Sequence, residues 1–151
     1  MDRLTLLALH RHFLAADAVK QFLFVAIPIG SETRRLPEDM VEVAQVWSTM
    51  LRLQVFYALM YVVIEGYVAL GCHDSVVDPL LAQSHFVEGF RRFRNANFHF
   101  QEDPFSPKLL EFLTAKGSES WARELYDALK AFFYKQLPIK EFIDSLPQRD
   151  L

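Results

Sequence analysis

The feature that most constrains the fold is an unbroken helical pattern that begins after Pro37 and continues to about residue 70. The proline and the early acids Glu38 and Asp39 are typical of a helix start, and Gly71 is typical of the position just past a helix end. Residues 55–64 are apolar on all sides, which indicates a central helix surrounded by others rather than a surface helix. The chain is therefore predicted to fold around this helix.

The remaining sequence divides into shorter helical segments at its caps, prolines and glycines. Asp2 is expected to cap a first helix that ends near Ala26, because Pro28 and Gly30 stop it, and residues 31–36 are expected to form a loop. Further helices are expected over residues 80–83, from Ser84 into residues 94–99, from Ser106-Pro107 to about 116, and over 119–136, with a loop at 101–105.

These segments predict an all-α fold, a single-domain antiparallel bundle of about five to six helices over residues 1–151. Its core is expected within residues 2–137, followed by a short terminal helix or tail over 138–151. Hydrophobic residues make up 52% of the chain, enough for one core. The single cysteine, Cys72, excludes an internal disulfide and argues against a cysteine-based zinc site, so a cytoplasmic location is predicted.

Two further classes of protein are disfavoured by the distribution of charge. A net charge of −3 argues against generic nucleic-acid binding but leaves room for a local basic site. Residues 53–72 are apolar enough to raise the alternative of a membrane span, but Gln54, Glu65 and the short uninterrupted apolar run argue against it. No membrane association is expected. His10 and His12 lie on different helix faces and are expected at the surface, and no metal site is expected.

One segment departs from simple packing logic. Residues 90–100 read Phe-Arg-Arg-Phe-Arg-Asn-Ala-Asn-Phe-His-Phe, with three arginines followed by two asparagines and a histidine. On an ideal helix Asn95 and His99 share a face, whereas Arg94 and His99 are about 140° apart around the axis. Arg94 and His99 can therefore act together only if the helix ends between them or a second copy of the chain supplies one of them.

These residue types suit the cleavage of an RNA phosphodiester by the neighbouring ribose hydroxyl. Histidine can take or give a proton near neutral pH, and arginine can hold the phosphate oxygens and their developing charge. Neither a metal nor another cofactor is required. Arg94, His99 and Asn95 are the predicted catalytic residues, with Asn95 orienting the imidazole or the RNA. Arg91 and Arg92 are candidates for RNA binding, or else form a solvated face.

The segment Arg94-Asn95-Ala96-Asn97-Phe98-His99 resembles the Arg-Asn-x-x-x-His motif of the HEPN superfamily. This resemblance implies a small all-α domain that forms a homodimer, in which two motifs face one another in a metal-independent endoribonuclease site. It also implies a role in a toxin–antitoxin or defence system, with an antitoxin or a nucleotidyltransferase-like protein as partner. Glu65 is the candidate for the supporting acid that some families place on an earlier core helix.

Other interpretations remain open beside the nuclease hypothesis. Arg94 could simply pair with a carboxylate, and Glu65 needs an arginine partner, either Arg94 or Arg52. His99 could be satisfied by a backbone carbonyl, and the flanking Phe98 and Phe100 leave open whether it is packed. The alternative function is a non-catalytic helical module that binds a protein, or a small ligand in an aromatic pocket between helices.

Overall fold

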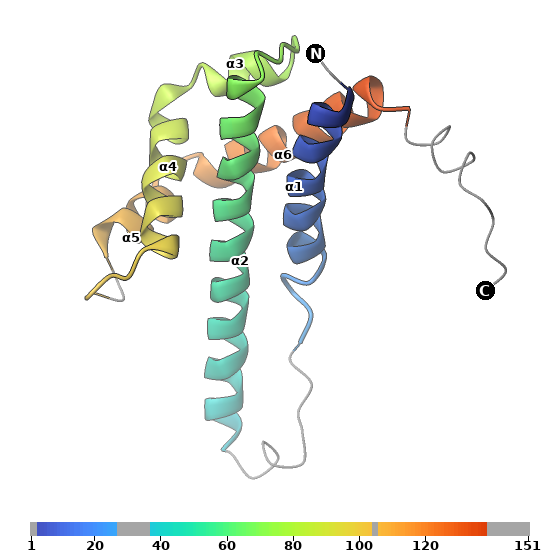
Figure 1. Cartoon of the computed structure of the whole chain (residues 1–151). Coiled ribbons are helices and arrows are strands. Elements are labelled where there is room, and N and C mark those ends of the chain that lie inside the picture. Colours follow the sequence, from blue (N-terminus) through green and yellow to red (C-terminus); the bar gives the residue numbers. More distant parts are fainter. Residues whose placement is uncertain (1–2, 27–36, 104–105, 139–151) are drawn as a thin grey trace, which may run out of the picture.

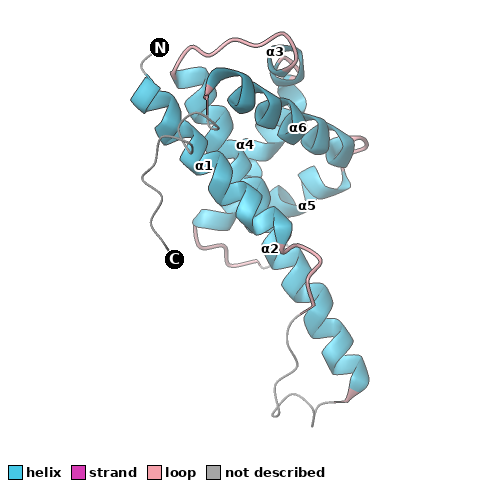
Figure 2. Ribbon diagram, turned by 90° about the vertical axis from the view of Figure 1, so that its right-hand side faces the viewer, coloured by secondary structure: helices cyan, strands magenta, loops and turns pink. Residues whose placement is uncertain are grey.

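The computed structural model describes residues 3–26, 37–103 and 106–138, and this part of the chain contains six helices and no strand (Figure 1, Figure 2). The helices are α1 (Arg3–Gln21), α2 (Glu38–Ala69), α3 (Val77–Leu81), α4 (Ser84–Phe98), α5 (Pro107–Thr114) and α6 (Ser118–Gln136). The predicted all-helical class is confirmed.

The long helix α2 is the axis of the bundle, as its uninterrupted pattern predicts. It lies between α1 and α4, and each of these three helices runs opposite to the next (Figure 1). All of its buried residues belong to the apolar second half, between Phe56 and Tyr67. At Gly66 the helix has no Cβ, and one would collide with Cδ1 of Leu9, so this glycine lets α1 approach α2 closely.

The core is unusually rich in aromatic side chains that connect the helices. Tyr57 of α2 packs its ring 5.2 Å from that of Phe90 of α4, and the Phe90 ring lies 5.1 Å from Trp121 of α6. The Trp121 indole N–H donates to the carbonyl of Leu80 at 3.0 Å. Helix α6 lies across α1 and α2 instead of antiparallel to them, so the predicted antiparallel order holds for only part of the bundle (Figure 1, Figure 2).

Two helix boundaries differ from the prediction because side chains bind backbone groups there. Helix α1 ends at Gln21 rather than near Ala26, and the carbonyl of Phe22 accepts a hydrogen bond from the guanidinium of Arg52 on α2. The short helix α3 spans Val77–Leu81 instead of the expected 80–83. It begins early because the carboxylate of Asp74 accepts from the amides of Val76, just before the helix, and Val77, its first residue, at 2.8 and 3.3 Å.

Several predictions concern residues outside the described part of the chain. They are the cap at Asp2, the helix stop at Pro28 and Gly30, the loop at 31–36, the last two residues of the loop at 101–105, and the terminal segment beyond Pro138. The described residues 101–103 are not helical, as expected.

The first half of α2 extends beyond the other helices (Figure 2). None of residues 38–55 is buried, in contrast to the second half of the helix. By length and composition α2 would suffice to cross a membrane, a test that the core helix of a soluble protein also passes. In its most apolar stretch 39% of the residues are buried inside the bundle, so this helix both belongs to the core and projects from it.

Candidate functional site

The candidate site lies at the carboxyl end of α4. One side of this helix carries aromatic side chains that face the core. Phe86, Phe90 and Phe93 are buried, as their spacing of four and three predicts. The predicted functional side chains leave from the other faces of the helix. Packing against α2 and α5 therefore fixes α4 and, with it, the positions of the arginines.

Arg94 is held by two acceptors. Its Nη2 donates to Oε2 of Glu65 on α2 at 2.7 Å, and its Nη1 donates to Oδ1 of Asn95 at 2.8 Å. The guanidinium carbon lies 5.8 Å from the ring centre of Tyr61. The Arg94 side chain is 28% exposed and that of Glu65 is 43% exposed, so solvent reaches both partners. Of the two arginines considered for Glu65, the structure selects Arg94.

Tyr61 of α2 lies close enough to this ion pair for its charges to affect the phenol. Burial raises the pKa of its phenol, and the charge of Glu65 raises it further, against smaller opposing effects of Arg91 and Arg94. The hydroxyl therefore stays protonated at neutral pH, and Tyr61 can serve the site as a hydrogen-bond donor but not as a base.

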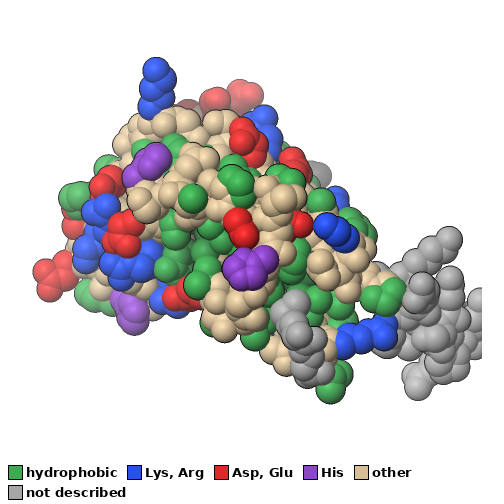
Figure 3. All heavy atoms as spheres, turned by 90° about the horizontal axis from the view of Figure 1, so that it is seen from above, with side chains coloured by type: hydrophobic (Ala, Val, Ile, Leu, Met, Phe, Trp, Pro, Cys, Tyr) green, Lys and Arg blue, Asp and Glu red, His purple; other side chains and the backbone are tan. Residues whose placement is uncertain are grey.

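Arg91 and Arg92 are paired with carboxylates as well. Arg91 donates to both oxygens of Glu88, at 2.8 and 2.7 Å, and this contact lowers the pKa of the Glu88 carboxyl. Arg92 lies 3.1 Å from Glu111 of α5. Basic and acidic side chains are accordingly interspersed on the side of the molecule where α4 and α5 lie (Figure 3). The three arginines thus face three glutamates, and their charges largely cancel.

His99 lies just past the end of α4, in an extended conformation with φ −117° and ψ 139°. Its side chain is exposed, and the flanking Phe98 and Phe100 are 54% and 91% exposed. Within the described part of the chain no hydrogen bond holds the imidazole, so the backbone-carbonyl interpretation has no support there. Solvent, and any ligand, can reach His99.

No hydrogen bond joins Arg94 to His99 within the described part of the chain. The backbone amide of His99 donates to the backbone carbonyl of Asn95 at 3.1 Å, and His99 then leaves the helix in its extended conformation. The side-chain amide oxygen of Asn95 accepts from Arg94, and the predicted role of Asn95 toward the imidazole stays a prediction.

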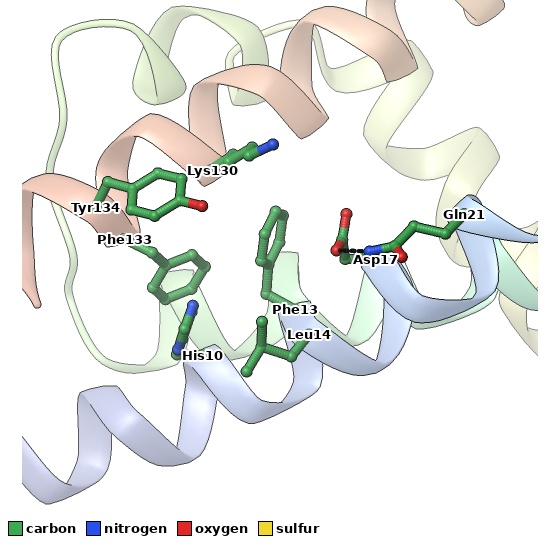
Figure 4. A pocket seen from close by; sticks show the side chains of 8 residues that line it. All are labelled: His10, Phe13, Leu14, Asp17, Gln21, Lys130, Phe133 and Tyr134. Atoms are coloured by element: carbon green, nitrogen blue, oxygen red, sulfur yellow. Dashed lines mark hydrogen bonds between the residues drawn. The ribbon is translucent and has the colours of Figure 1, made fainter. Parts of the chain in front are cut away.

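A hollow whose place the sequence did not indicate lies between α1 and α6 (Figure 4). Its volume is about 350 Å³. It is lined by His10, Phe13, Leu14, Asp17, Gln21, Lys130, Phe133 and Tyr134. Asp17 accepts from Gln21 at 2.7 Å and from the hydroxyl of Tyr126. The α1 members recur at helical spacing, and this pattern was the signal that could have revealed the hollow.

His10 is not the free surface residue that its sequence position suggested. Its ring centre lies 4.9 Å from that of Phe133, and burial lowers the pKa of the imidazole. The hydrophobic residues around it come from two helices far apart in sequence, so the pattern of α1 alone could not show this burial.

Within the described residues, no three histidine, cysteine, aspartate or glutamate side chains are grouped so that they could hold a metal ion. Cys72 is buried, and burial raises the pKa of its thiol. Nδ1 of His73 lies 3.2 Å from the carboxylate of Asp78, which also accepts a hydrogen bond from the hydroxyl of Tyr67.

Comparison of the chain with protein-family models, with curated proteins and with solved structures gives no match. Any functional assignment therefore depends on the side chains described above.

Proposed function

We propose that this chain is a HEPN-like domain that acts on RNA as a homodimer and cleaves it without a metal ion. The observation that carries the proposal is the exposed His99 at the end of the core helix that presents Arg94. Exposure is the condition that a catalytic imidazole must meet, and a buried His99 would have excluded the idea. The all-helical fold and the Arg-Asn-x-x-x-His motif support the same assignment.

In the proposed reaction His99 removes the proton from a ribose 2′-hydroxyl, whose oxygen attacks the adjacent phosphorus. Arg94 binds the non-bridging oxygens and stabilises their developing negative charge. The bond to the 5′-oxygen breaks, and that oxygen takes a proton from the protonated imidazole of the other copy. The products are a 2′,3′-cyclic phosphate and a free 5′-hydroxyl, so protons and bonds balance without a further reactant.

Glu65 has a defined part in this proposal. It holds Arg94 at 2.7 Å while no RNA is bound, and it must share the guanidinium with a phosphate when RNA binds. Since a guanidinium carries five N–H donors, Arg94 can contact Glu65 and a phosphate together. Asn95 helps to orient Arg94, and Arg91 and Arg92 are proposed to contact RNA beyond the scissile bond.

A cleavage assay tests the proposal. The purified chain is incubated with mixed RNA in the presence of a chelator, and the products are examined for cyclic phosphate ends. His99→Ala is expected to lower the rate by at least about 100-fold, the smaller end of a general acid–base contribution. His12→Ala, which removes an exposed histidine from α1, is the matched control and should cleave normally. Cleavage that survives His99→Ala would reject the assignment.

The second candidate function is a non-catalytic interaction module, and one observation favours it. Each arginine of the site is already paired with a glutamate, which weakens the attraction for phosphate. In a toxin–antitoxin setting such a module would bind an antitoxin or a nucleotidyltransferase-like partner. If the wild-type chain neither binds nor cleaves RNA, that result would favour this second candidate. A third outcome is that a small ligand binds in the hollow between α1 and α6. Such binding would raise the melting temperature of the chain.

A further inference from the structure

The hollow between α1 and α6 has the size of a small-molecule site and a mostly apolar surface (Figure 4). Its volume of about 350 Å³ lies at the lower end of the range for ligand pockets, about 300–1,000 Å³. Phe13 of α1 and Phe133 of α6 are buried lining residues and form its floor, with their ring centres 5.2 Å apart. Leu14 of α1 is half-exposed at the rim. A ligand of this hollow therefore needs a compact apolar body.

His10 adds an uncharged ring to this floor. Its ring centre lies 4.9 Å from that of Phe133 and 6.3 Å from that of Phe13. Burial lowers the pKa of the imidazole, so the ring is neutral at neutral pH. The ring of Tyr134 lies on the same side of the hollow (Figure 4). Because aromatic rings gain from offset and edge-to-face contacts with one another, these rings favour an aromatic body over a linear chain.

Two hydrogen-bond donors of α6 line the same hollow without a protein partner. Lys130 and Tyr134 are four residues apart, so both side chains leave one side of the helix (Figure 4). Within the described part of the chain, neither the ammonium of Lys130 nor the hydroxyl of Tyr134 makes a hydrogen bond or an ion pair. The ammonium donates hydrogen bonds and adds a positive charge, and the hydroxyl can donate beside it. This pair suits an anion.

The acid that lines the hollow is already paired. Asp17 accepts from the amide of Gln21 at 2.7 Å and from the hydroxyl of Tyr126. Lys20 brings a positive charge to the same contact, because its Nζ lies 3.8 Å from the centre of the Tyr126 ring. Among the lining residues, which all belong to the described part of the chain, Lys130 therefore carries the charge that has no partner.

The number of charges selects the kind of anion. A single ammonium balances a single negative charge, which is the charge of a carboxylate. A phosphate monoester carries about −1.5 to −2 at neutral pH, and the hollow has no second unpaired cation among its lining residues to balance it. The nearby carboxylate of Asp17 adds to the cost of a doubly charged ligand.

We propose that the hollow between α1 and α6 binds a small aromatic carboxylate. The ring of the ligand packs against Phe13, Phe133 and His10. Its carboxylate accepts hydrogen bonds from Lys130 and Tyr134. Because α2 lies between α1 and α4, this hollow is separate from the candidate site at the end of α4, and the inference does not depend on the proposed function (Figure 1).

Calorimetric titration with phenylpropionate tests the proposal. The wild-type chain should bind one equivalent with a Kd of about 1 mM or lower, the range that a ligand with one ring can reach. Two probes separate the ring from the charge. Phenylethylamine carries the same ring with a positive charge, and propionate carries the carboxylate without the ring. Each should bind at least about 10-fold more weakly than phenylpropionate.

A pair of lysine variants locates the charge. Lys130→Met keeps the apolar stem and should weaken the binding of phenylpropionate by about 10-fold or more, the effect of losing a charge-assisted hydrogen bond. Lys135→Met is the matched control and should bind as the wild type does. Lys135 is an exposed lysine of the same helix, but it leaves α6 about 140° around the axis from Lys130 and lies 4.0 Å from Asp74.

A second pair of variants tests the α1 side of the hollow. Leu14→Glu places an acid at the rim and should also weaken binding by about 10-fold or more, because it repels the carboxylate and removes apolar contact. Leu4→Glu changes a leucine of α1 that is 74% exposed and does not line the hollow, so it should bind normally. Both leucines are exposed, and circular dichroism should show the helical content of the wild type in both variants.

Three results would overturn the proposal. They are a wild-type chain without saturable binding up to the solubility limit of phenylpropionate, binding that is unchanged in both Lys130→Met and Leu14→Glu, and tighter binding of phenylethylamine than of phenylpropionate. His99→Ala should bind phenylpropionate as the wild type does, because it changes the end of α4. Ligand binding and RNA cleavage can therefore each fail without the other.

Discussion

Arg94 of α4 and Glu65 of α2 form an ion pair in which Nη2 and Oε2 are 2.7 Å apart. The pair joins the candidate site to the central helix and neutralises the acid that stands alone in the most apolar part of the sequence. Because both side chains remain partly exposed, the pair holds Arg94 in place without removing it from solvent.

The first prediction concerns the strength of this pair. Both partners reach solvent, so a double-mutant cycle with Glu65→Gln and Arg94→Gln should give a coupling free energy of about 0.2–1 kcal/mol. Urea unfolding of the four proteins measures it, and the coupling should shrink in high salt, which screens exposed charges. Glu65→Gln should also strengthen RNA binding, because it removes a negative charge beside Arg94. A salt-insensitive coupling of several kcal/mol would contradict this picture and indicate a buried pair.

The second prediction separates the buried and exposed sides of α4. Phe93 has no solvent exposure and packs against Tyr57 and Phe112, so Phe93→Ala should lower the free energy of unfolding by about 3–5 kcal/mol. His99→Ala should change it by no more than about 0.5 kcal/mol, because its side chain is exposed. Chemical denaturation measures both. A large loss for His99→Ala would mean that the residue serves the fold rather than a ligand.

The sequence predicted those parts of the fold that local patterns determine. The central helix, the aromatic stripe of α4 and an arginine partner for Glu65 all follow from spacing and from the cost of an unpaired acid among apolar residues. The end of α1 could not be predicted, because Arg52 reaches the Phe22 carbonyl from 30 residues away. The start of α3 could not be predicted either, because it depends on the Asp74 carboxylate, which accepts from the backbone amides of Val76 and Val77.

The candidate site was only partly accessible from the sequence, for a similar reason. Spacing places Arg94 and His99 on different sides of an ideal helix, but it cannot say what lies opposite each of them, and His99 itself has an extended backbone. The exposure of His99 depends on where α4 ends, and the pairing of Arg92 with Glu111 depends on how α5 folds back. The burial of His10 likewise depends on α6, whose oblique course no single-helix pattern reveals.

The third prediction is a loss of stability in mild acid caused by His10. Burial holds the pKa of its imidazole below that of the unfolded chain, which is about 6.5. As the pH falls through this value the unfolded state binds a proton that the folded state does not, so the free energy of unfolding decreases. The decrease ends once the pH is below the folded pKa. His10→Gln should flatten the dependence, measured by urea unfolding across this range, whereas His12→Gln should leave it unchanged. Identical pH profiles for wild type and His10→Gln would refute the assignment.

The fourth prediction concerns stronger acid and the contact between Tyr67 and Asp78. The buried Tyr67 hydroxyl donates to the Asp78 carboxylate at 2.7 Å, and this bond lowers the pKa of Asp78, with smaller help from His73. Its stabilising effect is present above the unfolded pKa of aspartate, about 3.9, and is lost as the pH falls through the lower folded pKa. Tyr67→Phe should therefore be less stable than wild type at neutral pH, with a gap that narrows in acid.

This narrowing distinguishes the charged acceptor from a simple packing effect, because Phe keeps the ring and removes only the hydroxyl. In an Asp78→Asn background the same Tyr67→Phe change should cost a similar amount at every pH, since an amide acceptor does not titrate in this range. Unfolding curves at about pH 7, 5 and 3, bracketing the aspartate pKa, provide the comparison. A gap of constant size in the wild-type background would show that the Asp78 carboxylate is not the group that responds to acid, and that the Tyr67 hydroxyl contributes to stability without this charged acceptor.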